Sequence, residues 1–254
     1  MPSTCEARCV KQFWIVSGLV VAALGASALI VAGGAFLGND PAPPSTRTQD
    51  MPWQVQPLPD GSSQVLGLRL SPDLQRSSAI GDVQQRWGDA VQIAIVAAPN
   101  EAGTIEAYVD PMQAGFISGK AIITASLPPD VIRGMRERAI KTEYMGGTTR
   151  KATLSPADLT EALKAPITSV SFIPSANLDE DIILSRFGQP AQRLRSNEHL
   201  EHFLYPDKGL DLTLDGKGKE LLQYIAPAHF DKLRQPLEDA QRAAETVTSP
   251  GSAP

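Results

Sequence analysis

Two short stretches of this chain are close copies of each other, and they constrain its fold more than any other feature. Arg86-Trp87-Gly88 and Arg186-Phe187-Gly188 each end a run whose apolar residues recur at helical spacing, and each precedes a run typical of a strand. Glycine is common directly after a helix because it adopts the left-handed backbone conformation without steric cost. The recurrence predicts two units of one kind, each with a helix followed by antiparallel strands.

Further patterns extend both units. In the first half, strands are predicted at 64–70, 90–98, 104–110 and 115–127, and a helix at 130–144. In the second half, strands are predicted at 167–173, 191–196, 199–205, 210–215 and 220–226, and helices at 176–188 and 228–244. The predicted fold class is α+β, with an N-terminal transmembrane helix and two helix/antiparallel-meander repeats. The expected divisions of the body are a first α+β repeat at 51–145, a second at 146–236 and a disordered tail at 237–254.

An apolar run without a charged residue covers residues 13–37, and it predicts a transmembrane anchor because a helix of this length crosses a bilayer. Arg8 and Lys11 precede the run, so the positive-inside rule makes residues 1–12 a cytoplasmic N-terminus. A Pro-rich linker follows at 38–50. We expect an inner-membrane, single-pass protein with a periplasmic body. A cleaved signal peptide is the alternative, and small residues at four-residue spacing allow a homodimer through this helix.

Charge and cysteine usage exclude some classes of function. The net charge is −5, and the chain has no dense cluster of Lys and Arg, so no nucleic-acid partner is expected. Cys5 and Cys9 both precede the apolar run, so the body has neither a disulfide nor a thiolate metal site. No cofactor is predicted.

His199 and His202 support an alternative function, a metal-dependent envelope hydrolase. Their spacing does not match the H-E-x-x-H zinc motif, and on a strand the two side chains would point to opposite faces. A catalytic zinc usually takes three protein ligands, and His229 is the one other histidine. The sequence has no G-x-S-x-G and no S-x-x-K motif. We therefore predict no catalytic, cofactor-binding or metal-binding residue, and a protein that is not an enzyme.

The second half resembles a known family. Gly188-Gln189-Pro190, Tyr205, the alternating leucines of 210–214, the turn at 216–218 and Ile225 are similar to SmpA/OmlA-type outer-membrane lipoproteins of the β-barrel assembly machinery. Their domain resembles one repeat of the β-lactamase-inhibitor-protein fold. The match covers residues 178–228, with a looser match in the first half, and the whole chain resembles a family of proteobacterial membrane-anchored proteins.

This resemblance implies tandem repeats in a periplasmic, non-enzymatic interaction or scaffold module of the cell envelope. The expected partner is an envelope protein or another envelope component, in addition to the lipid bilayer around residues 13–37. An inhibitor of a periplasmic enzyme is a further alternative, by analogy of fold. We expect the contact surface between the repeats, and the possible contact residues are Tyr108, Phe116, Tyr144, Arg150, Phe203 and Tyr205.

Overall fold

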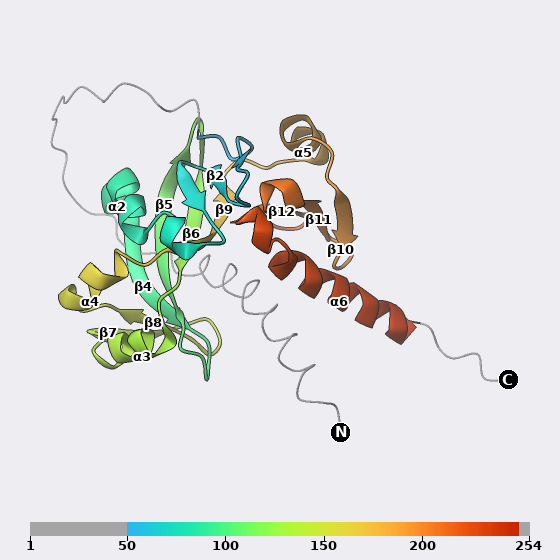
Figure 1. Cartoon of the computed structure of the whole chain (residues 1–254). Coiled ribbons are helices and arrows are strands. Elements are labelled where there is room, and N and C mark those ends of the chain that lie inside the picture. Colours follow the sequence, from blue (N-terminus) through green and yellow to red (C-terminus); the bar gives the residue numbers. More distant parts are fainter. Residues whose placement is uncertain (1–49, 249–254) are drawn as a thin grey trace, which may run out of the picture.

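The computed structural model describes residues 50–248, which form one long antiparallel sheet, a second small sheet and a few short helices (Figure 1). The long sheet has ten strands in the order β10-β11-β12-β13-β9-β6-β5-β4-β8-β7. Its strands are β4 (Val91–Ala97), β5 (Thr104–Ala114), β6 (Ile117–Ala125), β7 (Lys141–Met145), β8 (Thr149–Thr153), β9 (Ile167–Pro174), β10 (Gln192–Arg195), β11 (Leu200–Tyr205), β12 (Leu210–Asp215) and β13 (Leu221–Ile225). The small sheet consists of β1 (Gln56–Pro57), β2 (Ser63–Val65) and β3 (Leu68–Leu70).

The helices are short, with one exception. They are α2 (Ile80–Trp87), α3 (Pro129–Glu137), α4 (Pro156–Ala162), α5 (Glu180–Phe187) and α6 (Asp231–Thr248). Local signals fix their ends: the Asp179 carboxylate caps α5 by accepting the N–H of Ile182 at 2.8 Å. Gly88 and Gly188 end α2 and α5 with φ of 54° and 84°, as their place in the sequence predicts.

The predicted fold class is wrong. The described residues are mostly β, and the expected α+β repeats are replaced by one continuous ten-stranded antiparallel sheet with few helices. The helix predicted at 130–144 also ends early, at Glu137, and residues 141–145 form strand β7. β7 gains its backbone hydrogen bonds from β8, a tertiary contact that helical periodicity does not reveal.

The transmembrane helix is likewise no part of the described fold. Within residues 50–248, no helix is both long enough and apolar enough to cross a membrane, so the described structure does not contain the transmembrane helix that the predicted fold class includes. The run at 13–37, the N-terminus at 1–12 and residues 38–49 of the linker lie outside the described residues. The expected bilayer contact, homodimer and inner-membrane location depend on those residues.

The two halves of the chain join edge to edge in the long sheet. β6 pairs with β9 from Gly119 opposite Pro174 to Ala125 opposite Ile167. The first half contributes a three-stranded meander, β4 to β6, and the hairpin β7–β8 that returns to pair with β4. The second half contributes β9 and a four-stranded meander, β10 to β13. The predicted boundary at 145/146 lies in the β7–β8 turn, and α6 includes residues 237–248, which the sequence assigns to the tail.

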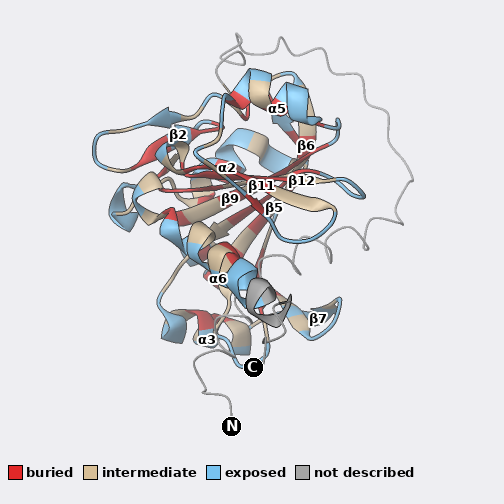
Figure 2. Cartoon of the chain, turned by 90° about the vertical axis from the view of Figure 1, so that its right-hand side faces the viewer, coloured by how far each residue is buried: buried red, intermediate tan, exposed pale blue. Residues whose placement is uncertain are grey.

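The long sheet has a core on each face, of unequal size. The larger core lies beneath α2, α3, α4, α5 and the small sheet, and extends along the long sheet from β8 to β11. The smaller core consists of Leu194, Leu204, Ile225, Phe230 and Leu237, and lies where α6 covers β10 to β13. In Figure 2, buried residues concentrate in the strands, while much of the outward surface of α5 and α6 is exposed. This arrangement leaves α5 on the opposite face of the sheet from α6.

Candidate functional site

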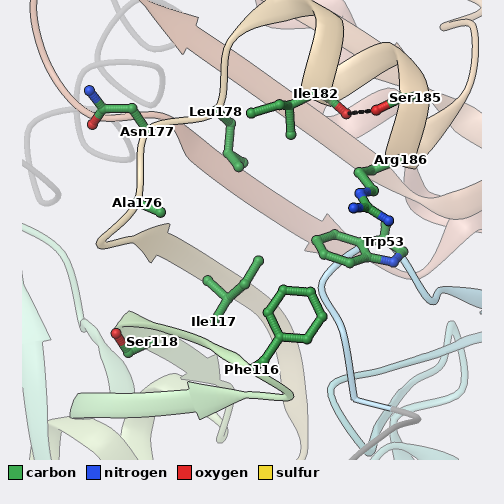
Figure 3. A pocket seen from close by; sticks show the side chains of 10 residues that line it. All are labelled: Trp53, Phe116, Ile117, Ser118, Ala176, Asn177, Leu178, Ile182, Ser185 and Arg186. Atoms are coloured by element: carbon green, nitrogen blue, oxygen red, sulfur yellow. Dashed lines mark hydrogen bonds between the residues drawn. The ribbon is translucent and has the colours of Figure 1, made fainter.

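A surface pocket of about 400 Å³ lies where the first half of the chain meets the second. Its walls come from the tip of the β5–β6 hairpin, the loop between β9 and α5, one side of α5 and the segment before β1 (Figure 3). The lining residues are Trp53, Phe116, Ile117, Ser118, Ala176, Asn177, Leu178, Ile182, Ser185 and Arg186. We call this site the aromatic pocket.

Trp53 is held in the aromatic pocket by its neighbours along the chain. Met51 is buried, and its side chain lies against Gly115 at the hairpin tip. The carbonyl of Pro52 accepts the hydroxyl hydrogen of the buried Tyr224 at 2.8 Å. The first contact ties this segment to the β5–β6 hairpin of the first half, and the second ties it to the core of the second half. The Trp53 ring is therefore fixed between the two halves.

Phe116 forms the exposed wall of the aromatic pocket. It lies at the β5–β6 turn, is 72% exposed, and its ring packs edge-on against Trp53 with centroids 5.9 Å apart. Gly115 allows this turn, since its φ is 63° and a Cβ there would lie 2.4 Å from the Met51 side chain. Phe116 therefore adds exposed apolar surface at the rim of the pocket.

Helix α5 supplies the opposite wall. Ile182 is 37% exposed and points from α5 toward the pocket, with Leu178 beside it (Figure 3). The inward side of the same helix is anchored by Phe187, which is buried and lies 6.2 Å from both Trp53 and Tyr205, centroid to centroid. Phe116, Trp53, Phe187 and Tyr205 therefore form a continuous row of aromatic rings from solvent into the core.

The carbonyl groups at the end of α5 are also satisfied by the β11–β12 region. The hydroxyl of Tyr205 donates to the Gly188 carbonyl at 2.9 Å, and the Lys208 ammonium donates to the Phe187 carbonyl. Burial raises the pKa of Tyr205 to about 12, so this hydroxyl stays a donor at neutral pH. These bonds fix the end of α5, and with it the position of Arg186.

Arg186 is the charged residue in the pocket lining. Its guanidinium carbon lies 5.1 Å from the centre of the Trp53 ring, a cation–π arrangement. Within residues 50–248 it forms no ion pair. The matching residue of the first half, Arg86, pairs instead with the Asp50 carboxylate. Neither arginine caps the carbonyls of its own helix.

The contact residues predicted from the sequence fall in four places. Phe116 lines the aromatic pocket. Tyr144 and Arg150 stack on each other at 5.2 Å in the exposed β7–β8 hairpin, at the far end of the sheet. Tyr108 lies on the face away from the larger core, where its hydroxyl donates to Asp110 at 2.8 Å. Phe203 and Tyr205 are buried, so neither presents a surface to a partner.

Sequence reasoning did not single out Trp53 or Ile182. The one available signal was the tryptophan itself, which lies between the linker and the first strand, three residues after Asp50. Nothing in the local pattern shows that this segment crosses the molecule to reach α5.

The histidine stretch does not form a metal site. His202 is buried on β11, with its Nδ1 3.0 Å from one Asp211 oxygen and 3.3 Å from Thr213 Oγ1. Its neighbour His199 is partly exposed before the strand. In the described part of the chain no three His, Cys, Asp or Glu side chains gather in a way that could bind a metal ion. The predicted hydrolase alternative therefore lacks a ligand set there.

A second polar group lies on the same face as His202, but in the first half. Lys120 Nζ is 3.1 Å from the Asp110 carboxylate, which also accepts the Tyr108 hydroxyl. The hydrogen bond that Lys120 donates to the Asp110 carboxylate raises the pKa of Lys120, so this lysine is charged at neutral pH. Nearby on β5, burial raises the pKa of Glu106 to about 7. This group holds a charged, mutually satisfied pair rather than an activated nucleophile.

No protein-family model matches this chain, and neither a curated protein nor a solved structure is detectably similar to it. The resemblance to SmpA/OmlA-type lipoproteins therefore stays a prediction.

Proposed function

We propose that this protein is a non-catalytic interaction module and that the aromatic pocket is its contact surface. The observation that carries the proposal is Phe116, which is 72% exposed beside a pocket lined by Trp53 and Arg186. Trp and Arg dominate the binding energy of protein interfaces when they surround a pocket that a partner side chain can fill. Rigid support also favours this role, since little side-chain freedom remains to be lost on binding.

The pocket chemistry supports binding rather than catalysis. Its polar lining groups are hydroxyls, an amide and a guanidinium, and it contains no carboxylate, histidine or cysteine. General acid–base work at neutral pH needs a group of that kind within reach of the reacting atom. An inhibitor of a periplasmic enzyme is the same kind of module with an enzyme as its partner, so the identity of the partner separates the two.

The test is photo-crosslinking in cells that produce the full chain. A photoreactive amino acid in place of Ile182 is expected to give a discrete adduct, and Phe116→Ser is expected to abolish it. Tyr144→Ser is the matched control, because Tyr144 is 69% exposed and lies at the other end of the sheet. An adduct that survives Phe116→Ser but disappears with Tyr144→Ser would move the contact surface to the β7–β8 hairpin and contradict the proposal.

A further inference from the structure

The charge in the aromatic pocket indicates what kind of group the pocket binds. The guanidinium carbon of Arg186 lies 5.1 Å from the centre of the Trp53 ring, and within residues 50–248 its N–H groups form no hydrogen bond, so these donors are left for another partner. No carboxylate of residues 50–248 takes that place as an ion-pair partner. A planar, pre-oriented guanidinium fits a carboxylate better than any other biological anion except phosphate.

The acidic residues at the start of α5 do not neutralise this site. Asp179 accepts the N–H of Ile182 as the helix cap, and Glu180 lies 2.7 Å from Arg193. Asp181 is exposed and is not part of the pocket wall. At the other end of the pocket, Lys219 donates to the Asn177 side chain and to the Ser175 carbonyl, so the second nearby cation is paired with neutral groups.

The apolar part of the pocket sets the other half of the specificity. Trp53, Phe116 and Ile182 surround an open volume of about 400 Å³, near the low end of the range for small-ligand pockets. This space suits one large side chain and the backbone that carries it. Because the Arg186 guanidinium lies over the Trp53 ring, a carboxylate bound to Arg186 lies next to the large side chain that occupies this space.

We propose that the aromatic pocket binds the free C-terminal end of a partner polypeptide whose last side chain is large and apolar. The proposal rests on the proposed function and names the partner's chemistry. A C-terminal residue carries its carboxylate and its side chain on one Cα, so both groups reach the pocket together. In an extended internal segment, an acidic residue and its apolar neighbour point to opposite sides of the chain, and the pair does not fit.

The test measures binding of three fluorescein-labelled peptides to the full chain by fluorescence anisotropy. The first is Gly-Ser-Gly-Ser-Gly-Leu-Phe with a free carboxylate, and the second is the same peptide with a C-terminal amide. The third has an internal Gly-Phe-Glu sequence flanked by Gly and Ser and an amidated end. The acid is expected to bind about tenfold more tightly than either amidated peptide, the size of a single charge-assisted contact.

Substitutions of the arginines locate the effect. Arg186→Gln is expected to make the acid and the amide bind equally, and Arg186→Lys to retain part of the preference because it keeps the charge but loses the planar fork. Arg86→Gln is the matched control, since it removes the same side chain from the corresponding helix end, and it is expected to leave the preference intact. Circular dichroism of each variant checks that the fold is kept.

Several results would overturn this inference while the proposed function stands. They are equal binding of acid and amide by the wild type, a preference that survives Arg186→Gln, tighter binding of the internal peptide, or absence of peptide binding while the crosslink from position 182 still depends on Phe116. If the Phe116 dependence of the crosslink is itself absent, the proposed function fails, whatever the peptides do.

Discussion

The helix ends Arg86-Trp87-Gly88 and Arg186-Phe187-Gly188 have nearly the same sequence and the same glycine stop, yet they serve different purposes. One segment, Asp50 to Trp53, accounts for much of the difference, because it reaches both helices. Asp50 gives Arg86 a carboxylate partner, whereas Trp53 gives Arg186 an aromatic surface and no charge. The arginine at the end of α2 is therefore neutralised by an ion pair. The arginine at the end of α5 has no ion-pair partner in the described part of the chain and lies beside the pocket.

The aromatic residues differ in the same way. Trp87 is partly exposed, and its indole N–H makes a long contact of 3.4 Å with the Gln113 carbonyl. Phe187 is 2% exposed and lies between Trp53 and Tyr205. The residue that supports the pocket is thus the more deeply packed of the two, which keeps the pocket wall rigid.

The largest effect is expected from truncation of the two aromatic residues. Phe187→Ala should lower the free energy of unfolding by about 3–5 kcal/mol, because it leaves a cavity in the larger core. Trp87→Ala should lower it by about 1–2 kcal/mol, since part of that ring already contacts water. Urea unfolding followed by far-ultraviolet circular dichroism measures both. Equal losses would show that the two helix ends are packed alike.

The next effect concerns the face of the sheet that lies away from the larger core, where the halves also differ. In the second half Asp211 pairs with His202. In the first half Glu106 has no cation partner among residues 50–248, and its burial raises its pKa to about 7. Since the folded pKa lies above the usual 4.5, the contribution of Glu106 to stability is complete below pH 4.5 and is lost as the pH rises through 7. Glu106→Gln should therefore raise the free energy of unfolding at pH 8, by about 1–3 kcal/mol.

The measurement compares urea unfolding of the wild type and Glu106→Gln between pH 5 and pH 8. The difference between the two proteins isolates Glu106, because His229, whose pKa burial lowers, titrates in both. A difference that stays constant across this range would show that Glu106 is ionised in the folded protein at pH 5.

A smaller effect is expected from removing the ion pair at the end of α2. Asp50→Asn should lower the free energy of unfolding by about 0.5–1 kcal/mol, because the ion pair with Arg86 is partly exposed, with side-chain exposures of 19% and 35%. A double-mutant cycle with Arg86→Gln gives the coupling energy, which should shrink in 1 M NaCl. Zero coupling at low salt would mean that Asp50 does not stabilise Arg86, so that neither helix end has an effective ion pair.

The smallest effect on stability is expected from substitution of Arg186 at the end of α5. Arg186→Gln should change the free energy of unfolding by about 0.5 kcal/mol or less, since it removes one exposed cation–π contact with Trp53. Thermal unfolding of the variant and of Arg86→Gln, measured side by side, provides the check. A loss at Arg186 greater than the loss at Arg86 would indicate that Arg186 has a structural role in place of a binding one.

Local signals in the sequence located many elements well. The strand predicted at 210–215 is β12 itself, and the strand predicted at 167–173 falls one residue short of β9. Alternation of apolar and polar residues reports which side of a strand is buried, and this depends on near neighbours. The same local patterns failed at β7, where a helical spacing continued past the true end of α3.

The candidate site was predicted only in part, because it depends on contacts between distant residues. Phe116 was among the six expected contact residues, whereas Phe203 and Tyr205 belong to the core. Their alternation on β11 does not reveal whether the face that carries them is covered, and α5 covers that face. The importance of Trp53 comes from Pro52 meeting Tyr224, two residues at opposite ends of the body.

The sequence by itself determined where the chain turns, which helices stop at a glycine and which strands have one apolar face, since backbone preferences and side-chain periodicity act over a few residues. Only the tertiary structure decided that β6 pairs with β9 to merge two expected repeats into one sheet. It also decided that Asp50 neutralises Arg86, whereas Arg186 lies over Trp53 and has no ion-pair partner within residues 50–248. Both outcomes arise from the packing of segments far apart in the chain, which local patterns do not encode.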